Sequence, residues 1–181
     1  MLKGIDFSHW QPKSLDGEIS KSDFFIHKLT EGNLYVDPEG LRRIPLFAEN
    51  KPTIVYHFLR DPKKADSEAL HFIKTVKETG FSHTLGVALD YECGKVDVKA
   101  AELWLFLVSK ALNKRPILYC GDMESRNVYQ MIRSRDYGLW IARYRKEPPN
   151  HISDFWQYTS DPIDRNIFFG EMAQLLTFIK G

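Results

Sequence analysis

Two acidic residues separated by a single position, Asp90 and Glu92, end the segment GVALDYE, which otherwise has the composition of a buried core strand. Along a β-strand, residues i and i+2 point to the same side, so both acids would face one way with Cα atoms about 6.6 Å apart. Like charges at this separation raise at least one pKa. A glycosidase uses such a pair, because one carboxylic acid must stay protonated beside a second group that is ionised. Asp-x-Glu is nevertheless a common sequence. Pairing with Lys or Arg, or capping of the following helix, explains the spacing equally well.

The elements that must position this pair alternate between strand and helix. Helical spacing is clear in residues 66–79 and 97–113, with Asp97 as N-cap of the second, and weaker in 38–50, 122–134 and 171–180, where Pro45 argues for a break in the first. Short β-rich runs occupy 2–8, 24–30, 53–59, 85–92, 116–121, 138–144, 154–159 and 163–169.

Eight strands with helical crossovers predict an α/β fold with a parallel barrel of the (β/α)8, or TIM, type. A regular barrel of this type takes about 250 residues, whereas the chain has 181. The last three predicted strands are also separated by loops too short for full helices. We therefore expect an irregular, incomplete barrel of eight strands with fewer helices on one side.

Polar and aromatic residues collect at the ends of these predicted strands, where barrel enzymes place their catalytic groups. Four of the eight strands would bring a carboxylate to one rim, and buried charges are costly unless they are paired or used. The set comprises Asp6, Ser8, Lys28, Thr30, Glu31, Tyr56, His57, Arg60, Asp90, Glu92, Tyr119, Arg143, Tyr144, Trp156, Gln157, Tyr158 and Asp164.

The overall composition restricts the class of protein. A hydrophobic fraction of 43% fits a globular domain, and a net charge of +1 without a run of Lys or Arg argues against a nucleic-acid partner. The N-terminal segment lacks the apolar region of a signal peptide, and the longest apolar run is too short to span a bilayer. We expect a monomer made in the cytosol, without membrane insertion. Cys93 and Cys120 are predicted to be free thiols, with a single bridge between them as the alternative.

Several motifs that follow one another along nearly the whole chain resemble glycoside hydrolase family 25, the Chalaropsis-type lysozymes. These enzymes are N-acetylmuramidases and include many phage endolysins. The matching motifs are GIDFSHWQ at 4–11, KLTEG at 28–32, YHFLR at 56–60, ALDYE at 88–92, PILYCG at 116–121, LWIARY at 139–144 and FWQYTSDPIDRN at 155–166.

The resemblance implies an irregular β/α barrel that hydrolyses the β-1,4 bond between N-acetylmuramic acid and N-acetylglucosamine in bacterial peptidoglycan, without a metal or other cofactor. The proposed acid of the family falls on Glu92 and its partner on Asp90. Asp6 and Asp164 match two further acids, which would hold this pair in position and tune its charge.

The resemblance also places the sugar groove. It implies sugar stacking on three aromatic residues, and the strand ends add three polar residues to the expected substrate-binding set. These six residues are Tyr56, Tyr119 and Trp156, followed by Gln157, Glu31 and Arg143.

The carboxyl spacing leaves the stereochemistry open. Retaining glycosidases have their two carboxyls about 5–5.5 Å apart and inverting ones about 6.5–9.5 Å. The carboxyl separation expected for an i, i+2 pair on a strand falls between these two ranges. The separation also has no predictive value if the 2-acetamido group of the substrate attacks the anomeric carbon.

The biological setting also has alternatives. We expect residues 1–181 to form one catalytic domain without a separate cell-wall-binding module. A phage endolysin that reaches the wall after release, an effector exported by a secretion machine and a chain trimmed of its signal all fit this expectation.

Other chemistries fit less well. A non-catalytic glycan-binding module would not need the complete set of acids. A cysteine hydrolase would use Cys93 or Cys120, but neither has a recognisable nucleophile context. The acid ladder D-x-x-D-x-D-x-E of chitinases is missing, because Val87, Ala88 and Leu89 precede Asp90.

Overall fold

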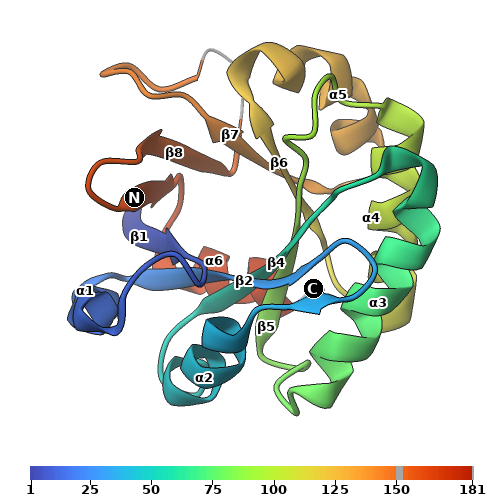
Figure 1. The fold of residues 1–181 in the computed structure, drawn as a ribbon. Helices are drawn as coiled ribbons and strands as arrows, with labels where there is room; N and C mark the ends of the chain where they lie inside the picture. Colours follow the sequence, from blue (N-terminus) through green and yellow to red (C-terminus); the bar gives the residue numbers. More distant parts are fainter. Residues whose placement is uncertain (150–152, 181) are drawn as a thin grey trace.

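The computed structural model describes residues 1–149 and 153–180, and its centre is a barrel of eight strands (Figure 1). The strands pair in the order β1-β9-β8-β7-β6-β5-β4-β2, and pairing of β1 with β2 closes the ring. This confirms the expected number of strands. They are β1 (Leu2–Phe7), β2 (Phe24–Glu31), β4 (Thr53–Phe58), β5 (Leu85–Asp90), β6 (Ile117–Gly121), β7 (Gly138–Ala142), β8 (Phe155–Thr159) and β9 (Asp164–Phe168).

The last strand departs from the expected parallel arrangement, because β9 runs antiparallel to both β8 and β1. A parallel connection needs a crossover of a dozen or more residues, and only residues 160–163 separate β8 from β9. The antiparallel direction places the beginning of β9 beside the C-terminal ends of the other strands. Asp164, the first residue of β9, therefore lies opposite Asp6 in the β1–β9 pair.

The helical shell is uneven, as predicted. Figure 1 shows α3, α4 and α5 gathered on one side of the barrel, and among residues 143–149, 153–154 and 160–163, which connect β7, β8 and β9, no helix is found. Asp97 caps α4 as expected, because its side chain accepts hydrogen bonds from the N–H groups of Lys99 and Ala100. The helices are α1 (Asp16–Lys21), α2 (Pro38–Phe47), α3 (Ala65–Glu78), α4 (Val98–Leu112), α5 (Asp122–Ser134) and α6 (Met172–Lys180), with short 3-10 turns at Lys13–Leu15 and Pro62–Lys64.

The expected break at Pro45 does not occur, since α2 continues through this residue to Phe47. Proline removes one backbone donor and crowds the preceding turn. Here it lies in the last turn of the helix, so that little of the helix follows it. The sequence also did not predict α1 or the two-residue strand β3 (Tyr35–Val36), which pairs with the end of β2. Both are too short to carry a periodic signal.

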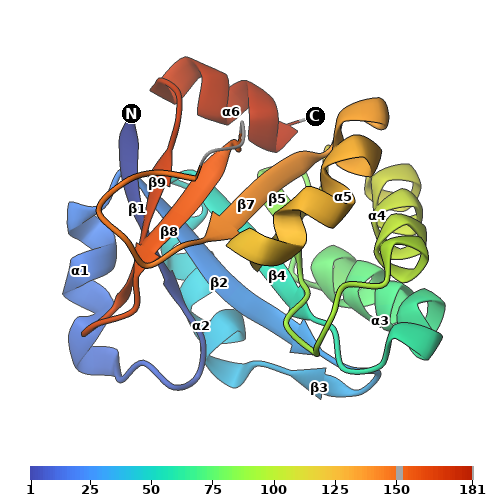
Figure 2. The ribbon, with the colours of Figure 1, turned by 90° about the horizontal axis from the view of Figure 1, so that it is seen from above.

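Helix α6 covers the end of the barrel at the N-terminal ends of the parallel strands, at the top of Figure 2. Its Leu175, Phe178 and Ile179 are buried against the interior side chains of the barrel. The close approach requires a glycine on β7, because a Cβ at Gly138 would lie 2.5 Å from the ring of Phe178. The opposite end of the barrel is the open rim.

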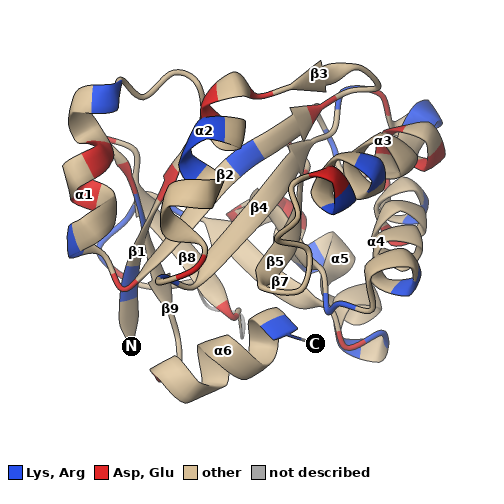
Figure 3. Ribbon diagram, turned by 90° about the horizontal axis from the view of Figure 1, so that it is seen from below, with Lys and Arg blue, Asp and Glu red and all other residues tan. Residues whose placement is uncertain are grey.

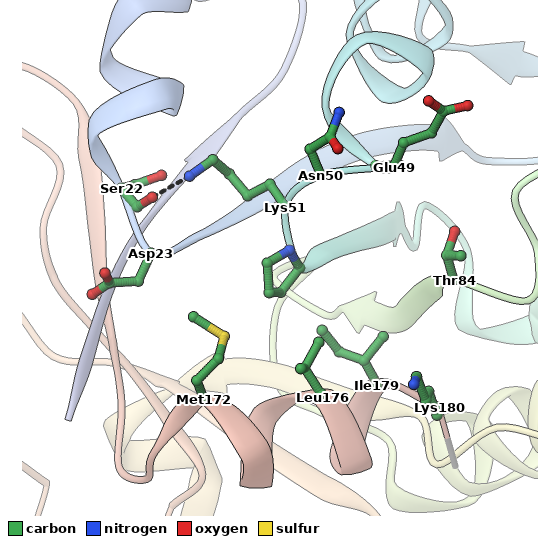
Figure 4. A pocket seen from close by; sticks show the side chains of 12 residues that line it. Ser22, Asp23, Glu49, Asn50, Lys51, Thr84, Met172, Leu176, Ile179 and Lys180 are labelled. Carbon is green, nitrogen blue, oxygen red and sulfur yellow. Dashed lines mark hydrogen bonds between the residues drawn. The ribbon is translucent and has the colours of Figure 1, made fainter.

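A pocket of about 580 Å³ lies between α6 and the loops that precede β2, β4 and β5 (Figure 4). Met172 and Leu176 form its apolar side, and the Lys51 ammonium donates a hydrogen bond to the Ser22 carbonyl across it. This pocket lies at the end of the barrel away from the strand-end acids.

The surface carries both signs of charge. Seen from below, Lys and Arg are interspersed with Asp and Glu along the helices (Figure 3). Within residues 1–149 and 153–180, no helix has the length and apolar character needed to cross a bilayer.

Candidate active site

A cavity of about 140 Å³ opens at the rim of the barrel and gathers all four predicted acids. Three other predicted or rim residues, Tyr56, Tyr119 and Gln157, share its wall with two aromatic residues that complete it. The lining consists of Asp6, Tyr56, Asp90, Glu92, Tyr119, Trp140, Tyr144, Gln157 and Asp164. Side chains from seven different strands and the loops after them therefore meet at one point.

The alternation along β5 places Asp90 and Glu92 on the same side, as predicted. Tyr91 between them points outward into the core shared with the helices, where its hydroxyl accepts a hydrogen bond of 3.0 Å from the Asp97 N–H. Asp90 is the last residue of β5 and is buried, whereas Glu92 follows the strand and is exposed at the mouth of the cavity. The two acids thus share one cavity in two different environments.

These environments raise both pKa values. Burial, reinforced by the nearby Glu92 carboxylate, raises the pKa of Asp90 well above its ordinary range. Its Oδ1 atom is buried and has no hydrogen-bond partner in the described structure. Partial enclosure of its carboxyl raises the pKa of Glu92, while the nearby Tyr119 hydroxyl and the charge of Lys28 act in the opposite direction.

Asp6 is held by a network of neutral side chains. Its Oδ2 atom accepts hydrogen bonds of 3.0 Å from Gln157 Nε2 and 2.6 Å from Asn166 Nδ2. Asn166 Oδ1 in turn accepts a hydrogen bond of 2.9 Å from the Trp140 indole N–H. Gln157 Oε1 accepts from the hydroxyl of Tyr119 at 2.7 Å. The network orients the carboxyl of Asp6 without neutralising it.

Burial and neighbouring carboxylates raise the pKa values of two further acids. Burial and the Asp164 carboxylate raise the pKa of Asp6 to about 7. Burial and Glu92 raise the pKa of Asp164 to about 6. The cavity can therefore hold protons at neutral pH, which is the property that a general acid requires.

Comparisons with known proteins agree with this geometry. Residues 5–167 match the family model of glycosyl hydrolases family 25. The chain is 30% identical to the protein YegX of Escherichia coli strain K12, over 99% of this chain and 74% of that protein. It is also 30% identical to the lysozyme of Lactococcus phage mv1, over 88% of both chains. The muramidase of Trichobolus zukalii has the same fold, with a TM-score of 0.80, 21% identity and full coverage of both chains.

The chain belongs to glycosyl hydrolases family 25. It is therefore a glycoside hydrolase, and the barrel described above is the fold of this family. The sequence-based resemblance and the expected enzyme class are confirmed.

Three of the predicted substrate-binding residues do not line the carboxylate cavity of this family 25 chain. Trp156 points out of the barrel. Its indole N–H donates a hydrogen bond of 2.8 Å to the Arg143 carbonyl, and its ring stacks on that of Phe169 with an interplanar angle of 4°. Arg143 donates a hydrogen bond of 2.8 Å to the Asp122 carboxylate. Glu31 accepts a hydrogen bond of 2.7 Å from Lys28. The charge of Lys28 partly offsets the rise in the pKa values of Asp90 and Glu92, so Glu31 is connected to the cavity through Lys28.

Three residues of the site were not among the predicted catalytic or substrate-binding residues, although Tyr144 was in the set of strand-end residues. Trp140 is buried in the barrel, with its ring centroid 4.4 Å from that of Tyr119. Tyr144 lines the cavity, and its hydroxyl donates a hydrogen bond of 2.7 Å to Gln157 Oε1. Asn166 donates a hydrogen bond to Asp6. The alternation of side chains along a strand could have identified the outward-facing tryptophan. Because Gln157 faces the cavity, the adjacent Trp156 must face the other way.

The two cysteines are free, as predicted. Cys120 is buried, and burial raises the pKa of its thiol to about 12. Burial also raises the pKa of Cys93. A thiolate nucleophile requires the opposite shift, so the structure does not favour a cysteine hydrolase.

Asp6→Asn is expected to stabilise the fold increasingly as the pH rises from about 4 to 7. The folded state keeps the proton of Asp6 up to a pKa of about 7, whereas an ordinary aspartate releases it near 3.8. Wild-type stability is therefore lost over this interval, while the neutral amide has no proton to lose. The asparagine oxygen can accept both hydrogen bonds that now reach Oδ2.

The gain in unfolding free energy should grow by roughly 1–4 kcal/mol, because one pKa unit corresponds to about 1.4 kcal/mol. Urea unfolding of both proteins at pH 4, 5.5 and 7 measures it. Exposed Asp136→Asn is the control. A difference between Asp6→Asn and wild type that does not change with pH would contradict the raised pKa.

Proposed function

We propose that this family 25 chain is an N-acetylmuramidase that hydrolyses the β-1,4 bond between N-acetylmuramic acid and N-acetylglucosamine in bacterial peptidoglycan. The observation that carries the proposal is the convergence of four acids in one cavity, with Asp90 and Glu92 in unlike environments. The lysozyme of a Lactococcus phage, 30% identical to the chain, supports the substrate and also a role as a phage endolysin.

In this proposal Glu92 is the general acid. It lies at the mouth of the cavity, where the glycosidic oxygen of a bound polymer can reach it. Its raised pKa favours the protonated form that the first step needs. Proton transfer to the glycosidic oxygen releases the leaving saccharide while positive charge develops at the anomeric carbon.

Asp90 stabilises the positive charge, or orients the substrate's 2-acetamido group to attack the anomeric carbon. Asp90 lines the cavity, and its Oδ1 atom has no hydrogen-bond partner among the described residues. Asp6 and Asp164 act as positioning residues, because their carboxyl groups line the same cavity as Asp90 and Glu92 and interact with them electrostatically. The developing positive charge thus meets preorganised carboxyl groups, and those that are ionised stabilise it.

Tyr119→Phe is expected to shift the alkaline limb of the pH–activity profile to higher pH. The Tyr119 hydroxyl beside Glu92 lowers the pKa of that carboxyl, and removal of the hydroxyl allows Glu92 to hold its proton to higher pH. The ring that packs on Trp140 is retained. Initial rates on solubilised peptidoglycan between pH 4 and pH 9 measure the limb. A limb that stays in place or moves to lower pH would contradict this role.

Mass spectrometry of purified peptidoglycan after incubation with the protein tests the proposed function. Soluble muropeptides that end in reducing N-acetylmuramic acid are the expected products. Products ending in reducing N-acetylglucosamine would identify a different glycosidase. Absence of any product, together with sedimentation of the protein with the wall, would indicate a non-catalytic binding module.

A further inference from the structure

The carboxylate cavity is too small to hold more than the reacting part of a glycan chain. Its volume is about 140 Å³, whereas pockets that enclose a whole small ligand measure about 300–1,000 Å³. If the substrate is a polysaccharide, as proposed above, most of its length must lie on the rim outside the cavity. The rim should therefore carry further binding surfaces.

One group of exposed aromatic residues on this rim has no role in the core. Of the four tryptophans, Trp10 is 79% exposed and the other three are at most 6% exposed. The ring of His9 lies 4.5 Å from the ring of Trp10 and 5.6 Å from that of Tyr35, which is 38% exposed. We call His9, Trp10 and Tyr35 the rim shelf. Exposed aromatic clusters of this kind mark binding surfaces more often than chance exposure of single residues does.

Buried groups hold the rim shelf in one conformation. The backbone N–H and Nδ1 of His9 both donate to Asp37 Oδ2, at 2.9 and 3.1 Å. Asp37 is fully buried, and its other oxygen caps α2. Arg43, also fully buried, donates 3.2 Å to the carbonyl of Ser8 and 2.7 Å to that of Gln11. The turn that presents Trp10 is thus fixed before any ligand arrives, which lowers the entropic cost of binding.

The rim shelf lies at the same end of the barrel as the cavity. Trp10 follows closely on β1, whose Asp6 lines the cavity, and Tyr35 lies on β3, beyond the end of β2 (Figure 2). The shelf therefore follows two neighbouring strands of the barrel, β1 and β2, and β1 also carries an acid of the site. The shelf and the cavity share one rim.

The chemistry of the shelf fits a pyranose ring. Indole and phenol rings offer broad apolar faces with polar edges, and sugar rings offer apolar C–H faces bordered by hydroxyls. We propose that the rim shelf binds a saccharide unit of the glycan strand away from the bond that is cleaved, with Trp10 as the stacking residue. This inference rests on the proposed function.

Calorimetry on the Glu92→Gln protein tests the inference, with N-acetylglucosamine hexamer, peptide-free glycan strands and peptide-substituted strands as ligands. Adding Trp10→Ala should weaken the affinity about tenfold, as expected for loss of one stacked ring, and Trp10→Phe should recover part of it. Phe106→Ala, which removes a 45% exposed ring on α4, is the matched control and should have no effect. Unchanged melting temperatures establish that each variant is folded.

The outcomes separate this inference from the proposed function. Equal binding of glycan by Trp10→Ala and its parent would overturn the role of the shelf, even where muropeptides are released normally. A loss of affinity seen only with peptide-substituted strands would assign the shelf to the stem peptide and overturn it as well. Failure of the parent to bind or cleave any glycan would instead refute the proposed function.

Discussion

Replacing Glu92 with glutamine is expected to lower the rate of peptidoglycan hydrolysis about 10²–10⁴-fold, the usual contribution of a general acid. The amide keeps the size of the side chain but cannot donate a proton to the glycosidic oxygen. Glu92 is exposed at the mouth of the cavity, so that its replacement should leave the fold unchanged. Quantified release of muropeptides by mass spectrometry measures the loss.

The control for this variant is Glu78→Gln, at the end of α3, whose side chain is 62% exposed. It should retain wild-type activity. Circular dichroism and melting temperature must match among the three proteins. A Glu92→Gln protein that keeps a tenth or more of wild-type activity would remove Glu92 from the role of acid.

Asp90→Asn is expected to lower activity by about 10²–10³-fold, the cost of removing one preorganised electrostatic stabiliser. The same change should raise the melting temperature at neutral pH. Asp90 is buried beside Glu92, and its raised pKa means that the folded state either desolvates a charge or takes up a proton. A neutral amide of the same size avoids both costs, so function and stability should change in opposite directions.

The sign of the stability effect provides a second check on Asp90→Asn. The pKa of Asp90 is raised in the folded state, so its contribution to stability is lost as the pH rises above the pKa of the unfolded chain. The stabilisation by asparagine should therefore be larger at pH 7 than at pH 4. Thermal unfolding at the two pH values measures it, and a variant less stable than wild type at pH 7 would contradict the burial argument.

Much of the fold could be predicted from local sequence patterns. The strands and the longer helices appear where apolar periodicity indicated them, and Asp97 caps α4 as its position before the helix suggested. The exceptions have local reasons. Pro45 interrupts nothing because it lies in the last turn of α2, and α1 and β3 are too short for a periodic signal.

The candidate site could be predicted in part for the same reason. The alternation of side chains along a strand is a local property. It therefore correctly predicted that Asp90 faces the cavity and that Tyr91 faces the helices. The same alternation, applied to β8, predicts that Trp156 faces outward, because its neighbour Phe155 is buried within the barrel. The choice of Trp140 as the cavity tryptophan depends on its pairing with Tyr119 across β6 and β7.

The sequence by itself determined the enzyme family, the barrel and the four acids of the site, because each depends on motifs or on the spacing of neighbouring residues. Only the tertiary structure decided that β9 reverses direction and brings Asp164 beside Asp6. It also decided that Asn166 and Gln157 hold Asp6, and that burial raises the pKa values of the acids. The reason is physical: desolvation and hydrogen bonding depend on groups far apart in the chain, and only closure of the barrel brings these groups together.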